Sequence, residues 1–142
     1  MPTDRTATVN AYFEAFGARD IDKLVSFFTP DATWIVPGDR SLTPWGGERR
    51  GPVEIREFFE LFFEAAEPLA FEVYSFTEVG NDQVLINGRF AYRFHKSGVE
   101  YEDEFVQRYT VSDDKITAFR IFEDSLGLAR AYLGQPVIAG GA

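Results

Sequence analysis

The chain lacks cysteine and has a single histidine, His95, among its 142 residues. Without cysteine it forms no disulfide, no thiolate metal site and no cysteine nucleophile. One histidine also excludes a metal centre built from several imidazoles. We therefore expect no metal site, and we expect any reaction to proceed without a cofactor.

Positive charge is also scarce, because 14 lysines and arginines face 23 aspartates and glutamates, for a net charge of −9. Nucleic acids and anionic membranes both require basic patches, so neither is an expected partner. No apolar run approaches the roughly 20 residues that span a bilayer, and the first ten residues lack the apolar centre of a signal peptide. These features predict a cytoplasmic protein.

Phenylalanine, by contrast, is abundant, with 15 residues in a chain that is 45% hydrophobic. This is more aromatic bulk than a small core needs, and it suits a fold that lines a cavity. The length predicts one domain over 1–142. We expect its core at about 5–134 and a loose, glycine-rich tail at 135–142.

Helical spacing of apolar residues predicts four helices, with one strand over 31–36 between the second and the third. Aspartates cap two of the helices, a glycine ends the first one, and a proline stands at the first position of the third. The first helix is expected to end at Gly17, and the second to follow Asp20 and stop before Pro30. The third is expected to begin at Gly51-Pro52 and stop before Pro68, and the fourth to follow Asp124 over 125–133.

From Phe71 onward the apolar period changes to two, which predicts four antiparallel strands joined by short turns. Helices on one face of such a sheet define an α+β fold, and a twisted sheet around helices leaves a conical cavity where inward side chains do not fill it. The strands are expected at 71–79, 83–95, 100–111 and 115–122.

Alternation along the third of these strands places two polar residues, Asp103 and Gln107, on the apolar face that points to the helices. A buried polar group without a hydrogen bond costs roughly 1–3 kcal/mol. The pair therefore indicates either a partner inside the protein or a ligand. Asp103 is a candidate general base, and bonding to backbone amides at the strand entrance is the alternative.

Both tryptophans lie in or beside the turn-rich segment WIVPGDRSLTPWGGERRGP, residues 34–52. Trp34 shares strand parity with Val36, so its indole is expected to line the cavity. Trp45 lies in a loop stiffened by Pro44 and followed by two glycines. The loop is either a lid over the cavity mouth or a hydrophobic plug. An aromatic wall suits a flat, apolar ligand.

Three blocks carry a resemblance to a known superfamily: YFEAFGARDIDKLVSFFTPDATWIVPG, GGERRGPVEIREFF and YEDEFVQRYTVSDDKITAFRIFED. Over about 9–133 they resemble the nuclear transport factor 2 superfamily, and within it the SnoaL-like polyketide cyclases and ketosteroid isomerases. The resemblance implies a cone-shaped α+β barrel with one apolar pocket. It also implies a homodimer through the outer face of the sheet, where Leu85, Ala91, Val106, Ala118 and Phe122 are expected.

The resemblance carries over to the catalytic positions only in part. Tyr12 matches the tyrosine donor of the isomerases, and Gln107 falls near their second donor. The position of the isomerase base is Val36, and that of the cyclase acid/base is Ile121. Both carboxylates are therefore replaced by aliphatic residues.

Two functions follow from these observations. One is an isomerase, cyclase or dehydratase that moves a proton on a hydrophobic carbonyl compound, with Asp103 as base and Tyr12 and Gln107 as donors. The other is a non-catalytic module for ligand binding or dimerisation. The residues expected to contact a ligand are Phe16, Trp34, Val36, Trp45, Phe58, Phe62, Phe90, Tyr109, Ile121 and Asp124.

Overall fold

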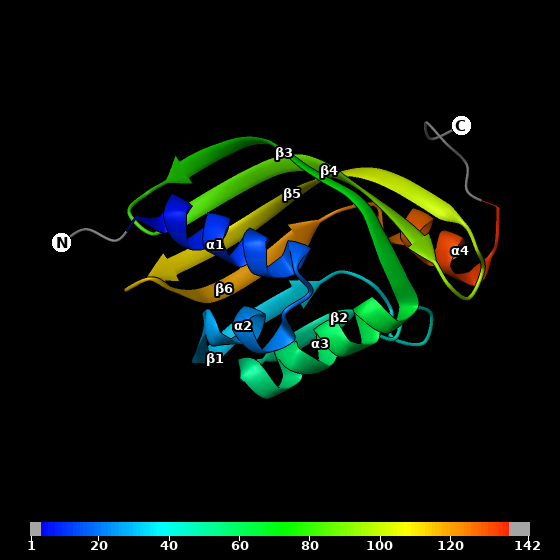
Figure 1. Ribbon diagram of the computed structural model, residues 1–142, viewed down its shortest axis with the longest axis horizontal. Coiled ribbons are helices and arrows are strands. Elements are labelled where there is room, and N and C mark those ends of the chain that lie inside the picture. The colour runs from blue at the N-terminus through cyan, green and yellow to red at the C-terminus, as the bar shows by residue number, and fades with distance from the viewer. Residues whose placement is uncertain (1–3, 137–142) are drawn as a thin grey trace.

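The computed structural model describes residues 4–136, which form four helices and six strands (Figure 1). The expected tail falls largely on 137–142, outside the described residues. The helices are α1 (Arg5–Gly17), α2 (Ile21–Ser26), α3 (Gly51–Ala65) and α4 (Ser125–Leu133). The strands are β1 (Phe28–Val36), β2 (Gly47–Arg50), β3 (Ala66–Val79), β4 (Gln83–Phe94), β5 (Glu100–Ser112) and β6 (Lys115–Phe122).

The six strands form one curved sheet in the order β2-β1-β6-β5-β4-β3. All neighbours are antiparallel except β1 and β6, which run parallel. The long strands arch over α1, while α3 lies along β1 (Figure 1). This confirms the predicted cone-like α+β fold. The sheet is not closed, because β2 and β3 remain as its two edges.

Helix α1 corrects the expected role of Gly17. The helix includes Gly17 and ends at Ala18, whose φ of −83° is right-handed. Arg19 takes the left-handed conformation instead, with φ of 53°. Its N–H bonds to the carbonyl of Phe16, and that of Asp20 bonds to Ala15. The left-handed residue that follows the helix is thus Arg19, two residues after the predicted Gly17.

Three further boundaries differ from the prediction. β1 starts at Phe28, three residues early. β3 starts at Ala66 and contains Pro68, which an edge strand tolerates because its unpaired side needs no N–H donor. The short strand β2 was not predicted, because GERR has neither alternation nor β-branched residues.

The two predicted aspartate caps are confirmed. The Oδ1 atom of Asp20 accepts a hydrogen bond from Lys23 N at 3.1 Å, and that of Asp124 accepts one from Gly127 N at 2.9 Å. Each cap satisfies a backbone N–H group that has no partner within the helix, and it stabilises the helix by about 1 kcal/mol. Asp124 thereby fixes the start of α4 directly after the last strand.

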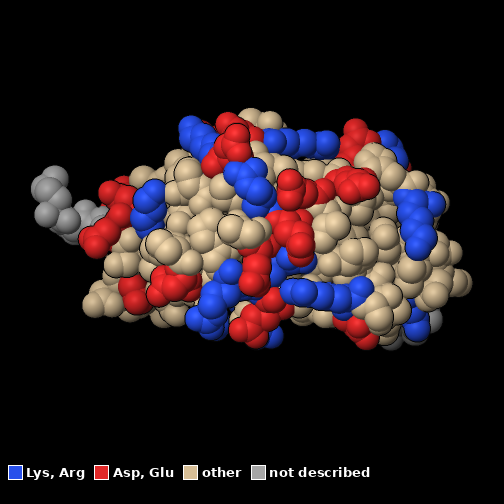
Figure 2. Space-filling view, turned by 90° about the horizontal axis from the view of Figure 1, so that it is seen from below, with Lys and Arg blue, Asp and Glu red and all other residues tan. Residues whose placement is uncertain are grey.

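No helix within residues 4–136 is long and apolar enough to cross a membrane. On the face that Figure 2 shows, acidic and basic side chains lie interspersed and do not separate into large areas of one sign.

Candidate functional site

A cavity lies between the concave face of the sheet and helices α1 and α3, and aromatic side chains form most of its wall. Its volume is about 60 Å³. One water molecule needs about 10–15 Å³, so the cavity could hold several. All but two of the residues expected to contact a ligand line it: Phe16, Trp34, Val36, Trp45, Phe58, Phe62, Tyr109 and Ile121.

The two exceptions have structural positions. Phe90 is fully buried and stacks on Tyr92 and Phe105, with ring centroids 4.4 and 5.8 Å away. Asp124 is exposed and caps α4. Neither belongs to the cavity wall. Tyr92, on which Phe90 stacks, lines the cavity instead of Phe90, and Glu123 lines it instead of the next residue, Asp124.

The three residues expected to converge do so only in part. Tyr12 and Gln107 line the cavity, and Asp103 does not. The carboxylate of Asp103 accepts hydrogen bonds from Glu104 N and Asp124 N, both at 2.9 Å. This is the alternative that the sequence left open for Asp103. Its acceptor oxygens satisfy two backbone donors where β6 leads into α4.

Sequence reasoning missed the carboxyl group that does line the cavity, which is that of Glu123. Burial, followed by the nearby charges of Asp103 and Asp124, raises its pKa from the ordinary 4.5 to about 8. Within residues 4–136 its carboxyl group has no hydrogen-bond partner and no ion pair. Glu123 is therefore an acid or base poised near neutral pH.

A signal for Glu123 is present in the sequence. Phe119 and Ile121 point into the cavity, and Glu123 continues their alternation by one more step. The strand ends at Phe122, and the prediction stopped the inward face there too. Glu123 lies between the end of β6 and Asp124, the residue that caps α4.

Three tyrosines line the same cavity, Tyr12, Tyr92 and Tyr109. Burial raises the pKa of each above the ordinary 10.0, so all three stay neutral and can donate a hydrogen bond. The charge of Glu123 adds to the raised pKa of Tyr92, which indicates that the two groups are close.

Gln107 is oriented by one of these hydroxyls. Tyr109 donates a hydrogen bond to Gln107 Oε1 at 2.7 Å, inside the protein. The amide oxygen is thus occupied, and the amide N–H groups of Gln107 remain for an acceptor in the cavity. Among residues 4–136 the hydroxyls of Tyr12 and Tyr92 have no hydrogen-bond partner, so they too can serve a ligand.

The two tryptophans occupy different parts of the wall. Trp34 stacks on Phe119 with ring centroids 4.1 Å apart. Trp45 is 1% exposed and packs against Phe94, Tyr132 and Phe62, at 5.8, 4.9 and 5.8 Å. In this structure Trp45 closes the end of the cavity next to α4.

The arrangement suits proton transfer in an apolar enclosure. It offers one carboxyl group with a raised pKa, neutral hydroxyl and amide donors, and aromatic walls that keep water out. Residues 4–136 contain no cluster of three or more side chains that could hold a metal ion.

Comparison with solved structures shows that the chain has the fold of NTF2-like α+β proteins. An NTF2-like protein from Burkholderia xenovorans is 29% identical, with a TM-score of 0.78, covering 89% of this chain and 94% of its own. One from Burkholderia pseudomallei is 21% identical, with a TM-score of 0.83 and coverages of 92% and 98%. TerC, co-crystallised with polyporic acid, is 23% identical, with a TM-score of 0.79 and coverages of 90% and 97%.

Within that class, the chain belongs to the SnoaL-like domain family, whose sequence model matches residues 9–119. This confirms the family resemblance drawn from the sequence. A search among curated proteins finds no match.

Proposed function

We propose that the protein is an enzyme that moves a proton on small, largely apolar carbonyl compounds, as an isomerase, cyclase or dehydratase without a cofactor. The observation that carries the proposal is Glu123, a carboxyl group in an aromatic cavity whose pKa is raised to about 8. Such a pKa suits a general acid or base, because proton transfer is most efficient when the pKa lies near the working pH.

The proposed step is the removal of a proton from the carbon next to a carbonyl group. The ionised carboxylate of Glu123 takes the proton, and the electron pair of the broken C–H bond moves to the carbonyl oxygen. The hydroxyl of Tyr12 and the amide of Gln107 stabilise the enolate oxygen by hydrogen bonds. Return of the proton from Glu123 to another carbon completes an isomerisation. In a dehydration, the enolate electrons form the new C=C bond, the C–O bond to a β-hydroxyl breaks, and Glu123 returns the proton to the leaving oxygen, which departs as water.

Asp103 has a different role in this proposal, that of a positioning residue. Its Oδ2 accepts the N–H of Asp124, the residue that follows Glu123. This hydrogen bond holds the backbone next to Glu123 in place. The negative charge of Asp103 also helps to keep the Glu123 carboxyl group protonated. The base expected from the sequence would thus act through the neighbouring glutamate.

Proton exchange tests the proposal without knowledge of the natural substrate. The protein is incubated in D₂O with small aryl ketones such as acetophenone, and deuterium at the α-carbon is followed by NMR. We expect exchange above the buffer rate, and a loss of about 10²- to 10⁴-fold in Glu123→Gln, as for removal of a general base. Glu60→Gln is the matched control, since Glu60 is exposed on α3.

Equal exchange in Glu123→Gln and in the unmodified protein would remove Glu123 from the mechanism. Ketone binding without any exchange, across a panel of aryl and alicyclic ketones, would favour the non-catalytic binding module instead.

The proposal includes a cytoplasmic homodimer formed through the outer face of the sheet. Val106 and Phe122 are 37% and 43% exposed on that face, with partly buried Leu85 and Ala118 nearby, whereas the expected Ala91 is buried. Arg108 and Arg120 stand directly opposite each other on β5 and β6. Like charges in that position are destabilising unless a partner offsets them.

The charges around Val106 favour a second copy of the chain as that partner. Glu104 lies two residues before Val106 and Arg108 two residues after it, and within residues 4–136 neither forms an ion pair. A twofold axis near Val106 would set the Glu104 of each protomer against the Arg108 of the other. Light scattering at micromolar concentration should give a dimer, and Arg108→Glu a monomer. A monomer before substitution would contradict this part of the proposal.

A further inference from the structure

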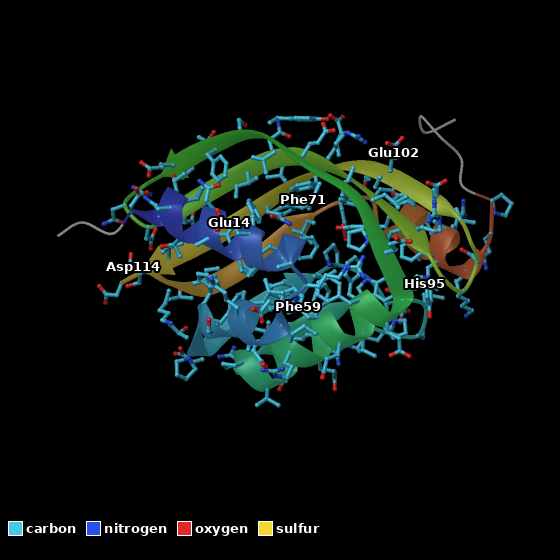
Figure 3. All side chains as sticks on the ribbon, viewed as in Figure 1. Glu14, Phe59, Phe71, His95, Glu102 and Asp114 are labelled. Atoms are coloured by element: carbon cyan, nitrogen blue, oxygen red, sulfur yellow. The ribbon has the colours of Figure 1, made fainter. Side chains whose placement is uncertain are left out.

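A second hollow adjoins the cavity and opens to solvent between α1 and β3. This α1–β3 groove has a volume of about 540 Å³ and is lined by Asn10, Glu14, Gly17 and Val73 together with three phenylalanines. The phenylalanines are Phe13, Phe16 and Phe71, and all three also line the cavity. Figure 3 shows Phe71 beside α1, with Glu14 on the helix. The two hollows are therefore separated only by side chains that belong to both.

This shared wall is more exposed to solvent than the aromatic walls around it. Phe13, Phe16 and Phe71 are each half-buried. On the remaining walls, side chains such as Phe59 and Tyr109 are 1% and 0% exposed. A ring with one side open to solvent displaces fewer packed neighbours when it changes rotamer than a ring inside a close-packed core does.

Among residues 4–136, side-chain hydrogen bonds tie α1 to the β3–β4 hairpin at one end only, the end where α1 starts. Arg5, at the start of α1, donates hydrogen bonds to the carbonyls of Val79, Gly80 and Gln83, at 3.3, 3.1 and 2.9 Å. At the other end of α1, ring contacts join the helix to β3, with Phe71 lying 5.1 Å from Phe13 and 5.6 Å from Phe16. Within residues 4–136 no hydrogen bond crosses the gap there.

The volumes show why the groove matters for a ligand. The cavity holds about 60 Å³, whereas sites for drug-sized molecules hold about 300–1,000 Å³. The opposite end is closed by Trp45, which is 1% exposed. The phenylalanine wall borders the open groove, so a ligand larger than a few heavy atoms has room to extend through this wall.

We propose that substrates enter between α1 and β3 and that the α1–β3 groove binds an apolar chain attached to the carbonyl group held in the cavity. The choice of a carbonyl head rests on the function proposed above. The substrate class is then an aryl or alicyclic ketone that carries an alkyl chain, with the chain lying along Phe16, Phe71 and Val73.

The rim of the groove narrows this class further. Glu14 is exposed there and forms no ion pair within residues 4–136. A chain that ends in a carboxylate would place a second negative charge beside it, so the groove favours an uncharged chain. The expected penalty for a terminal carboxylate is about 2- to 5-fold in affinity, the range of surface charge interactions.

A series of phenyl alkyl ketones from acetophenone to decanophenone tests the inference by calorimetric titration of the whole protein. A fully buried methylene contributes about 0.8 kcal/mol, or about fourfold in affinity, so a chain in an open groove should gain about twofold per methylene. Gly17→Phe should abolish this gain, because the new side chain projects into the groove and a Cβ at Gly17 has no atom within 4 Å to clash with.

Ala18→Phe is the matched control. Ala18 is exposed and adjacent to Gly17, but it does not line the groove. We expect it to keep the dependence on chain length, and circular dichroism checks that both variants fold. A carboxylate at the end of the chain should weaken binding, and Glu14→Gln should remove that penalty.

Three outcomes would overturn the inference. The affinity could be independent of chain length in the unmodified protein, Gly17→Phe could show the same dependence, or the whole series could fail to bind. Titration requires no turnover, and Glu123→Gln should keep the chain-length dependence. Loss of the catalytic proposal and loss of the groove proposal are thus separate results.

Discussion

On the convex face of the sheet, glutamates lie beside arginines, while on the concave face one glutamate has no cation. Arg89 bonds to Glu72 and Glu102 at 3.1 and 2.5 Å across three neighbouring strands, and these hydrogen bonds, together with the charges of the two carboxylates, raise its pKa. Glu123 lies among aromatic rings, and its pKa is raised to about 8 by burial. The same sheet thus keeps charges ionised and paired on one face and holds a carboxyl group ready to exchange its proton on the other.

The largest expected effect is the pH dependence of folding stability that Glu123 causes. Between about pH 4.5 and 8 the folded protein keeps a proton that the unfolded chain has lost, since the pKa rises from 4.5 to about 8 on folding. Stability therefore falls as the pH rises through this window and levels off above it, by a total on the order of a few kcal/mol. Urea unfolding at pH 5, 6.5 and 8 measures this loss.

Glu123→Gln should flatten that part of the pH dependence, because the amide does not titrate, and should be more stable than the unmodified protein at pH 8. Glu60→Gln should keep the original slope. Identical slopes in all three proteins would show that Glu123 titrates normally in the folded state.

A smaller effect is expected from Asp103, which connects the two faces through the backbone at the end of β6. Asp103→Asn retains one acceptor oxygen and loses one of the two bonds to Glu104 N and Asp124 N. We expect a loss of about 1–2 kcal/mol in stability. We also expect the pH profile of ketone exchange to move to lower pH, because one of the charges that raise the pKa of Glu123 is gone.

That shift of the profile separates the positioning role from direct catalysis. A base removed outright abolishes exchange at every pH, whereas a positioning residue changes the pH at which exchange occurs. Complete loss of exchange in a folded Asp103→Asn protein would restore Asp103 as the base predicted from the sequence.

The smallest effect is expected on the convex face. Glu102→Gln removes one of the two carboxylates beside Arg89, and the bond to Glu72 remains. The charges are exposed and screened by salt, so the melting temperature should fall only slightly at low salt and not measurably at 1 M NaCl. A decrease larger than that of Asp103→Asn would mean that the paired face, not the Asp103 junction, dominates stability.

Local patterns predicted those parts of the fold that local interactions determine. β6 and α4 have their predicted bounds, because alternation defines the strand and the Asp124 side chain defines the helix start. The parallel pairing of β1 with β6 joins segments far apart in the chain, and β2 exists only because β1 offers it an edge. Neither the β1–β6 pairing nor the strand β2 produces a local pattern in the sequence.

The site shows the same limit. Alternation correctly placed Gln107 on the inward face of the sheet, yet it could not show that two backbone N–H groups would occupy Asp103. The same alternation, continued one residue past the end of β6, would have placed Glu123 on the inward face. The prediction missed Glu123 because it stopped at the strand end. Which polar residue of an inward face meets the cavity depends on the backbone donors around it.

The anchoring of α1 at Arg5 also affects which amide protons exchange with solvent. Three carbonyl partners near residue 80 hold the first turn, whereas ring contacts hold the last turns. The helix should therefore open from its C-terminal end as a local unfolding unit. Backbone amides of residues 14–18 would then lose deuterium protection before those of residues 8–11, and a ketone bound across the phenylalanine wall would slow the exchange of the first group selectively.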